Sequence, residues 1–216
     1  MPVIAPSILS ADFANLERDI HDIERSGADW VHVDVMDGMF VPNISIGIPV
    51  VKALRPVTSL PLDVHLMIDR PIRYAEEFIK AGADWLTIHL ESDQPQNTLA
   101  CLDKILAMGC KAAISLKPKT PAEAAIPYLT KCDMVLVMTV EPGFGAQKFM
   151  ADMMPKLKKL RQMLDKVNPA CILEVDGGVD AVTYKTCREN GAEALVTGSA
   201  YFKAADRAAF VQALRK

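Results

Sequence analysis

The stretch Gly27-Ala28-Asp29-Trp30-Val31-His32-Val33-Asp34-Val35 joins the end of a helical pattern to a short, mostly apolar strand. The same design recurs where Gly82-Ala83-Asp84-Trp85 leads into Leu86 to Leu90, and where Gly191-Ala192-Glu193 leads into Ala194 to Thr197. In each copy the glycine suits the left-handed position after a helix, and the acidic residue closes the turn before a buried strand. The chain therefore predicts one helix–turn–strand unit that is used several times.

Apolar runs elsewhere extend this unit to eight predicted strands, which alternate with helical patterns. The strands are expected at Val3 to Ile8, Val31 to Val35, Leu62 to Leu66, Leu86 to Leu90, Ala112 to Leu116, Met134 to Val140, Ile172 to Val175 and Ala194 to Thr197. The helices are expected at Phe13 to Ser26, Pro49 to Leu54, Ile72 to Ala81, Asn97 to Met108, Pro121 to Leu129, Asp152 to Val167, Thr183 to Asn190 and Asp206 to Leu214. Strand starts recur roughly every 27 residues, which is about the size of a βα unit.

The predicted strands are nearly continuous apolar runs, as expected for a parallel sheet with helices on its outside. Eight strict alternations predict an α/β fold, a closed (β/α)8 or TIM barrel, whose interior should be bulky and apolar. An open, doubly wound sheet is the alternative, but no reversal of strand order is visible. The chain has 216 residues and no linker or low-complexity tract, so residues 1–216 are expected to form one domain.

The composition excludes several classes of protein. Half of the residues are apolar and 24% are charged, which excludes disorder, collagen and coiled coil. The net charge of −3 provides no basic surface for nucleic acid or for an anionic membrane. No apolar run approaches the roughly 18 residues of a membrane span, and the N-terminus does not resemble a signal peptide, so we expect a cytoplasmic location. The five cysteines include no Cys-x-x-Cys pair, and we expect them to be reduced packing residues.

Four polar side chains interrupt or end predicted strands, on the barrel face where chemistry is usually found. His32 and Asp34 share one side of their strand because they are two residues apart, while His65 and Asp176 end two other strands. Two imidazoles and two carboxylates form a ligand set for one divalent metal ion, with Zn²⁺ favoured and Fe²⁺, Mn²⁺ or Co²⁺ as alternatives. The competing interpretation is that each residue is an ordinary hydrogen-bonded core group.

The other two histidines receive different predictions. His89 also ends a predicted strand, but we find no partner carboxylate near it in the sequence, so it is expected behind the metal ligands or against the substrate. His21 lies in a polar helical pattern and is expected at the surface.

Glycine-rich turns follow the last three predicted strands. They are Thr139 to Gln147, which contains Gly143, Phe144, Gly145 and Ala146, then Gly177-Gly178, and finally Gly198-Ser199-Ala200. Glycine lets backbone amides turn toward an anion, and the loops after strands seven and eight of such barrels frequently hold phosphate. One glycine pair is more often a simple turn, but three in consecutive loops predict a phosphate site.

Methionines provide the last feature of the predicted barrel mouth. Met36, Met67 and Met138 lie within or just after strands there, where a soft apolar lining would exclude water around a reactive carbanion. Ordinary core packing is the alternative. A metal beside two aspartates, with phosphate held at one end, suits removal of a proton next to a carbonyl. One carboxylate would take the proton from one face and the other would return one to the opposite face, which inverts the carbon.

Several multi-residue motifs resemble the ribulose-phosphate 3-epimerase family. They are Ala5 to Phe13, His32 to Gly38 with Phe40 to Asn43, Asp63 to Met67, Val137 to Gly145, and Glu174 to Gly178. The resemblance runs from Ala5 to about Ser199 in the order of the family. It implies an isomerase that interconverts D-ribulose 5-phosphate and D-xylulose 5-phosphate, in the pentose phosphate pathway, through an enediolate. It also suggests a homo-oligomer.

The resemblance also implies a role for each matched residue. Asp34 and Asp176 would be the acid/base pair, and both would bind the metal together with His32 and His65. Ser7 and His65 would contact the substrate, while Met36, Met67 and Met138 would lie near the enediolate. The phosphate would be held by Gly143, Phe144, Gly145, Ala146, Gly177, Gly178, Gly198 and Ser199.

Two departures from the family pattern and three alternative functions remain. The family commonly has glycine at Ala146, which matters if the amide needs a positive φ, and histidine at Met39. An epimerase of a six-carbon ketose phosphate, such as allulose 6-phosphate, has motifs that do not differ from these. A decarboxylase or synthase on a related barrel would not need the four His and Asp residues. A non-catalytic phosphosugar-binding barrel would have lost at least one of them.

Overall fold

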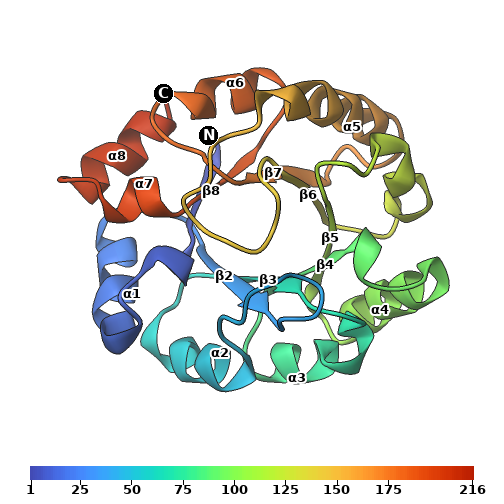
Figure 1. The fold of residues 1–216 in the computed structure, drawn as a ribbon, viewed down its shortest axis with the longest axis horizontal. Helices are drawn as coiled ribbons and strands as arrows, with labels where there is room; N and C mark the ends of the chain where they lie inside the picture. Colours follow the sequence, from blue (N-terminus) through green and yellow to red (C-terminus); the bar gives the residue numbers. More distant parts are fainter.

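The computed structural model describes residues 1–216 and contains one parallel, eight-stranded sheet. The strands are β1 (Val3–Pro6), β2 (Val31–Met36), β3 (Leu62–Met67), β4 (Trp85–His89), β5 (Lys111–Leu116), β6 (Met134–Met138), β7 (Ile172–Asp176) and β8 (Ala194–Thr197). They pair in the order β1-β8-β7-β6-β5-β4-β3-β2, so the sheet curls into a ring whose ends are β1 and β2 (Figure 1). The prediction of a (β/α)8 barrel is confirmed.

The ring closes at a thin seam between β1 and β2. The other neighbouring strands pair over three to six residues, whereas β1 and β2 are joined by a single parallel bridge between Ser7 and His32. Nearer the start of both strands, the amides of Asp29 and Trp30 donate to the carbonyl of Ile4, at 2.9 and 3.3 Å. The seam therefore places Ser7 directly beside a predicted metal ligand.

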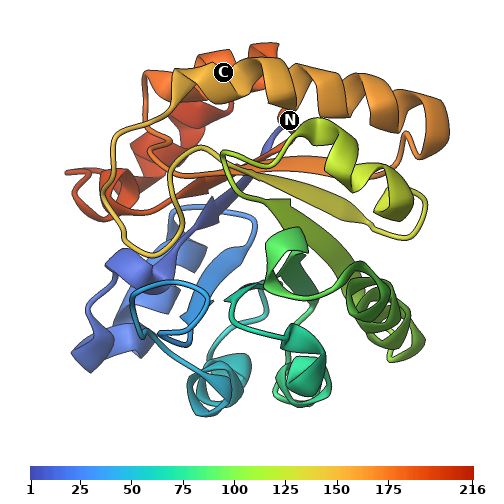
Figure 2. The same cartoon turned by 45° about the vertical axis from the view of Figure 1, so that its right-hand side comes forward.

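An outer layer of helices covers the ring (Figures 1 and 2). The helices are α1 (Leu16–Arg25), α2 (Ile48–Leu54), α3 (Ala75–Lys80), α4 (Pro95–Ala107), α5 (Met154–Val167), α6 (Thr183–Glu189), α7 (Ser199–Phe202) and α8 (Arg207–Leu214). Outward-facing strand residues such as Val31, Val33 and Val35 are buried beneath them in the main core cluster. Each buried valine of this kind stabilises the fold by about 1.5–3 kcal/mol.

The interior of the ring is more polar than predicted. His32, Asp63 and Glu174 are completely buried there, together with Thr87 and Ser115. The expectation of a bulky apolar filling is therefore wrong at this level. His32 and Asp63 hydrogen-bond to one another, whereas the side-chain oxygens of Thr87, Ser115 and Glu174 have no hydrogen-bond partner.

Several predicted elements have different ends or a different type. The helix predicted at Pro121 to Leu129 is a 3-10 helix, Ala122–Tyr128, because Pro127 within it has no N–H to donate. The first and sixth strands end early because the side chains of Ser7 and Thr139 hydrogen-bond to the backbone where the chain turns. The helices predicted from Phe13 and Ile72 each begin as a separate 3-10 turn, and α7 was not predicted.

Two other expectations concern the chain as a whole. All five cysteines are buried and unpaired, as predicted. None of the helices combines the length and apolar character needed to cross a membrane. His21 lies in α1 and is partly exposed.

Candidate active site

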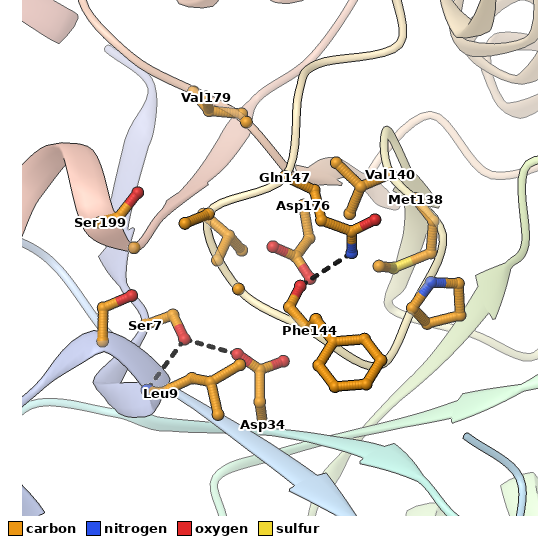
Figure 3. A pocket seen from close by; sticks show the side chains of 18 of the residues that line it. Ser7, Leu9, Asp34, Met138, Val140, Phe144, Gln147, Asp176, Val179 and Ser199 are labelled. Atoms are coloured by element: carbon orange, nitrogen blue, oxygen red, sulfur yellow. Dashed lines mark hydrogen bonds between the residues drawn. The ribbon is translucent and has the colours of Figure 1, made fainter. Parts of the chain in front are cut away.

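A cavity of about 410 Å³ opens where the strands end. Figure 3 shows Ser7, Asp34 and Asp176 around it, with the segment after β6 passing close by. The predicted residues that line it are Ser7, Asp34, Met36, Met67, Met138, Gly143, Phe144, Gly145, Ala146, Asp176, Gly177, Gly178, Gly198 and Ser199. His32 and His65 do not line it, because they are fully buried and contact Asp34 from inside the barrel.

The four predicted metal ligands come together at this cavity. Oδ1 of Asp34 lies 3.2 Å from Nε2 of His32 and 3.2 Å from Nδ1 of His65. Oδ2 of Asp176 lies 3.8 Å from the same Nδ1. One donor atom from each of the four residues lies within 4.8 Å of the others. The sheet register makes this possible, since Asp34 of β2 stands beside His65 of β3.

This donor set fits a divalent cation. Imidazole nitrogen and carboxylate oxygen are ligands that zinc and similar metals share. Nδ1 of His32 is 2.6 Å from Oδ2 of Asp63, so the opposite nitrogen, Nε2, is the one that faces the cluster. A carboxylate behind a histidine in this way is the usual support for a metal-binding imidazole. The residues present can therefore hold one metal ion.

The two aspartates occupy opposite electrostatic environments. Burial by itself raises the pKa of Asp34, but the charges and hydrogen bonds of His32 and His65 lower that pKa well below its ordinary value. Burial, followed by the negative charge of Asp34, raises the pKa of Asp176 to about 6. Two carboxyl groups whose pKa values are pushed apart are suited to separate acid and base roles.

Two buried carboxyl groups that the sequence patterns did not predict, Asp63 and Glu174, lie next to the predicted ligands. Burial opposes a charge on His32, but Asp34 and Asp63 raise its pKa well above the ordinary value. Burial, and then the charge of Asp63, raises the pKa of Glu174 well above its usual range. Asp63 and Glu174 each stand two residues before a predicted ligand, and so on the same side of the strand. That spacing is the signal that could have found them.

His65 has a support of its own, which involves His89. Nε2 of His65 lies 2.9 Å from Nε2 of His89, whose Nδ1 lies 3.2 Å from Oε2 of Glu91. The expectation that His89 has no carboxylate near it in sequence is therefore wrong. Glu91 is only two residues away, within the 3-10 turn Leu90–Ser92, and its side chain points back toward His89 at the end of the strand. His89 does lie behind a predicted metal ligand, His65, and this is one of the two placements expected for it.

The three predicted methionines surround the cavity with apolar atoms. Met36 and Met67 pack with Val41, and Met138 packs with Leu136 and Val140. All three methionines are almost completely buried although they line the cavity. The methionines thus both pack in the core and line the cavity.

Gly177 and Gly178, which also line the cavity, are required by space as well as by backbone angle. Gly178 has φ +66°, and a Cβ there would lie 2.7 Å from the backbone nitrogen of Phe149. Gly177 has φ +122°, and a Cβ would lie 2.6 Å from Val140. Ala146 has φ +58°, so it adopts the left-handed conformation in spite of its side chain. The departure from glycine leaves this backbone form in place, at a cost of roughly 1–2 kcal/mol.

The segment from Glu141 to Gln147 arches across the barrel mouth toward the residues after β1 (Figures 1 and 2). Asn43 Nδ2 donates to the carbonyl of Gly143 at 2.7 Å, which fastens the segment to the loop after β2. Gln147, which was not predicted as a site residue, lines the cavity and donates to the carbonyls of Glu141 and Phe144. Met39 is 79% exposed and does not line the cavity.

Fold and site together define a class of protein. A (β/α)8 barrel with two carboxyl groups of opposed pKa, a cluster of donors that fit a metal and glycine turns around one cavity is typical of an enzyme that transfers protons on a small molecule. Comparison with known proteins narrows this class.

A model of the ribulose-phosphate 3-epimerase family matches residues 3–202. The ribulose-phosphate 3-epimerase of Bacillus subtilis (strain 168) is 48% identical over 213 residues, which cover 98% of this chain and 97% of that protein. The chloroplastic ribulose-5-phosphate-3-epimerase of Arabidopsis thaliana is 47% identical and covers 99% of this chain and 76% of its own. The chain belongs to the ribulose-phosphate 3-epimerase family, and it is therefore an isomerase with the epimerase activity of that family.

Solved structures with low sequence identity share the fold alone. The 3-keto-L-gulonate-6-phosphate decarboxylase of Vibrio cholerae has a TM-score of 0.74 at 15% identity, and covers 99% of this chain and 95% of its own. The 3-hexulose-6-phosphate synthase of Salmonella typhimurium has a TM-score of 0.70 at 19% identity, and covers 99% and 96%. These likenesses agree with a TIM barrel.

Proposed function

We propose that the enzyme interconverts D-ribulose 5-phosphate and D-xylulose 5-phosphate by proton transfer between Asp34, Asp176 and the third carbon of the sugar. The observation that carries this proposal is that both carboxyl groups face one cavity, from β2 and from β7, with their pKa values pushed in opposite directions. One aspartate removes the proton from one face of the carbon, and the other delivers a proton to the opposite face. Because the reaction is reversible, each is the base in one direction and the acid in the other.

The four donors together would hold one divalent metal ion, Zn²⁺ by preference, with Fe²⁺, Mn²⁺ and Co²⁺ sharing the same ligand chemistry. The support is the fit of His32, Asp34, His65 and Asp176 around one point. When bound there, the metal supplies a Lewis acid that stabilises the negative charge of the enediolate, by several kcal/mol. The side chains of His32 and His65 keep both carboxylates in place around it.

The rest of the cavity would bind and shield the sugar phosphate. The backbone around Gly177, Gly178, Gly198 and Ser199, with the segment Gly143 to Ala146, would bind the phosphate through amide groups. Met36, Met67 and Met138 would exclude water from the enediolate. Ser7, whose hydroxyl lies in the cavity beside Asp34, would contact the sugar. His65 is fully buried and does not line the cavity, so it would act through the metal instead of by the expected contact with the substrate.

A six-carbon ketose phosphate, such as allulose 6-phosphate, is the second candidate substrate. It is favoured only by the room in the cavity, which at about 410 Å³ does not exclude one more carbon. We expect the ratio kcat/KM to be higher for D-ribulose 5-phosphate, since that ratio measures discrimination between substrates. A higher value for the six-carbon sugar would reverse the assignment.

The proton-transfer step has a direct test. Incubation with D-ribulose 5-phosphate in heavy water should replace the hydrogen on the third carbon with deuterium, as followed by proton NMR. The absence of exchange with either sugar would contradict the proposal and would favour a phosphosugar-binding barrel without catalysis.

The remaining proposals concern the setting of the enzyme. Residues 1–216 would act as one catalytic domain, since every proposed site residue lies on a strand of one sheet or in a segment that directly follows such a strand. The five reduced cysteines agree with a cytoplasmic location. A homo-oligomer would be seen as a molar mass that is a multiple of 23.6 kDa in light scattering.

A further inference from the structure

The geometry points to Glu91 and His89 as positioning residues that keep the ring proton of His65 on Nε2 and so direct its bare Nδ1 to the metal. This inference rests on the proposed metal site, because it concerns one of the four ligands. His89 acts on the cluster through its contact with His65, and Glu91 acts through His89.

The contact between the two imidazoles allows only one arrangement of hydrogens. Nε2 of His65 and Nε2 of His89 are 2.9 Å apart, so one nitrogen donates and the other accepts. The choice is made on the far side of His89, where Nδ1 faces Oε2 of Glu91 at 3.2 Å. A carboxylate only accepts hydrogen bonds, so Nδ1 of His89 carries the hydrogen. Its Nε2 is then the acceptor, and Nε2 of His65 must be the donor.

Glu91 is itself fixed by two donors from the segment after β5. Its Oε1 accepts the backbone N–H of Lys117 at 2.9 Å and the hydroxyl of Thr120. Oε2 is left to His89. The carboxylate is therefore anchored on one oxygen and acts on His89 with the other.

The packing prevents either imidazole from turning over. Both rings are fully buried and stacked, with centroids 5.0 Å apart and an interplanar angle of 26°. The ring of Phe40 lies 4.8 Å from that of His89, and Nζ of Lys117 lies 3.6 Å from the centre of the Phe40 ring. The hydrogen arrangement can therefore change only if the groups around it change.

Glu91→Gln is the variant that reverses this arrangement with few other changes. The backbone N–H of Lys117 requires an acceptor, so the amide oxygen takes the place of Oε1 and the NH2 group faces Nδ1 of His89. Nδ1 must then accept, Nε2 of His89 becomes the donor, and Nε2 of His65 becomes the acceptor. The hydrogen of His65 moves to Nδ1, where it opposes the metal. Binding of the metal would force two donors against each other in a buried place.

The test uses two readouts on the full chain. In metal-free protein, nitrogen-15 NMR should find the hydrogen of His89 on Nδ1 in the parent enzyme and on Nε2 in Glu91→Gln. The dissociation constant for Zn²⁺, measured by competition with a chelator, should rise roughly 10- to 100-fold in the variant. Glu123→Gln is the matched control, because Glu123 is an exposed carboxylate paired with Lys159, and it should change neither readout.

Each outcome decides one point. An unchanged hydrogen position on His89 together with an unchanged Zn²⁺ dissociation constant would overturn the inference. If the parent enzyme itself binds no Zn²⁺, the proposed metal site fails, while the position of the His89 hydrogen still tests Glu91. If Glu91→Gln does not fold, His89→Phe serves instead, because it keeps a ring against Phe40 but removes the acceptor for His65. Zn²⁺ affinity equal to that of the parent in His89→Phe would also overturn the inference.

Discussion

The hydroxyl of Ser7 donates a 2.5 Å hydrogen bond to Oδ2 of Asp34, and this contact crosses the seam between β1 and β2. The same hydroxyl accepts a hydrogen bond from the amide of Leu9, so one small side chain both ends β1 and holds an aspartate of the proposed acid/base pair. Asp34 is thus supported from two sides, by Ser7 across the seam and by the histidines of β2 and β3.

We predict that Ser7→Ala lowers the free energy of unfolding by about 1.5–3 kcal/mol, the usual contribution of a hydrogen bond to a charged group. It should also lower kcat/KM, because Asp34 loses a contact that orients it. Urea unfolding and steady-state kinetics check both effects. The exposed Ser59 provides a control, and Ser59→Ala should change neither quantity.

Asp176→Asn should reduce kcat by roughly 100- to 10,000-fold, the usual contribution of one general acid or base. Asparagine keeps the shape of the side chain but cannot exchange a proton, so circular dichroism should remain that of the parent enzyme. Asp34→Asn should act in the same way. As a control, Asp152→Asn changes an exposed carboxylate away from the cavity and should leave kcat alone. Near-normal turnover in either active-site variant would contradict the two-carboxylate mechanism.

Removal of the metal should abolish activity and lower the midpoint of thermal unfolding. A ligand present at 100 times its dissociation constant stabilises a folded protein by about 2.7 kcal/mol, and a chelator removes this contribution. Zn²⁺ or Co²⁺ should restore activity, whereas Mg²⁺ should not, because it prefers an all-oxygen site. Full turnover in protein shown to be metal-free by elemental analysis would exclude a catalytic metal.

Gly178→Ala should destabilise the protein more than Gly27→Ala does. Both glycines have a left-handed φ, +66° and +75°, so the added backbone strain is similar. A Cβ at position 27 meets nothing within 4 Å, but at position 178 it would lie 2.7 Å from the backbone nitrogen of Phe149. Strain alone costs roughly 1–2 kcal/mol. The larger loss at Gly178 should be accompanied by a higher KM, since the displaced backbone lines the cavity; equal losses would show that the overlap is relieved without cost.

Glu91 should contribute stability that disappears in acid. Burial would raise its pKa, but hydrogen bonds from His89, Thr120 and the Lys117 amide lower the pKa to about 2, from an ordinary value of 4.5. Its contribution is therefore complete above about pH 4.5 and is lost as the pH falls toward 2. Since one pKa unit corresponds to about 1.4 kcal/mol, the upper limit of the loss is about 3.5 kcal/mol, and solvent screening of this partly exposed carboxylate makes the loss smaller.

The measurement compares urea unfolding of the metal-free parent and Glu91→Gln between pH 7 and pH 2.5. The stability difference between the two proteins should shrink as the pH falls. Carbon-13 NMR of the Glu91 carboxyl group gives its titration directly, and a midpoint near 4.5 would contradict the prediction.

The sequence was sufficient for the barrel and for the centre of the site, for physical reasons. Buried parallel strands are apolar throughout, and burial of a polar group is costly. His32, Asp34 and Asp176 therefore stand out within them as candidate functional residues. Ser7 does not stand out, because a serine after a strand is common, and only the closing of the ring brings it to Asp34. Glu91 was missed for a similar reason, since its contact with His89 depends on a 3-10 turn that no periodic pattern announces.

The thin seam between β1 and β2 implies that a bound substrate would also stabilise the ring of strands. A sugar that contacts both Ser7 and Asp34 would bridge β1 and β2 and would add to the few backbone contacts between these strands. Because it would link the two end strands of the sheet, bound substrate should stiffen this part of the ring. The proposed reaction site thus lies at the place where the ring of strands has the fewest backbone contacts.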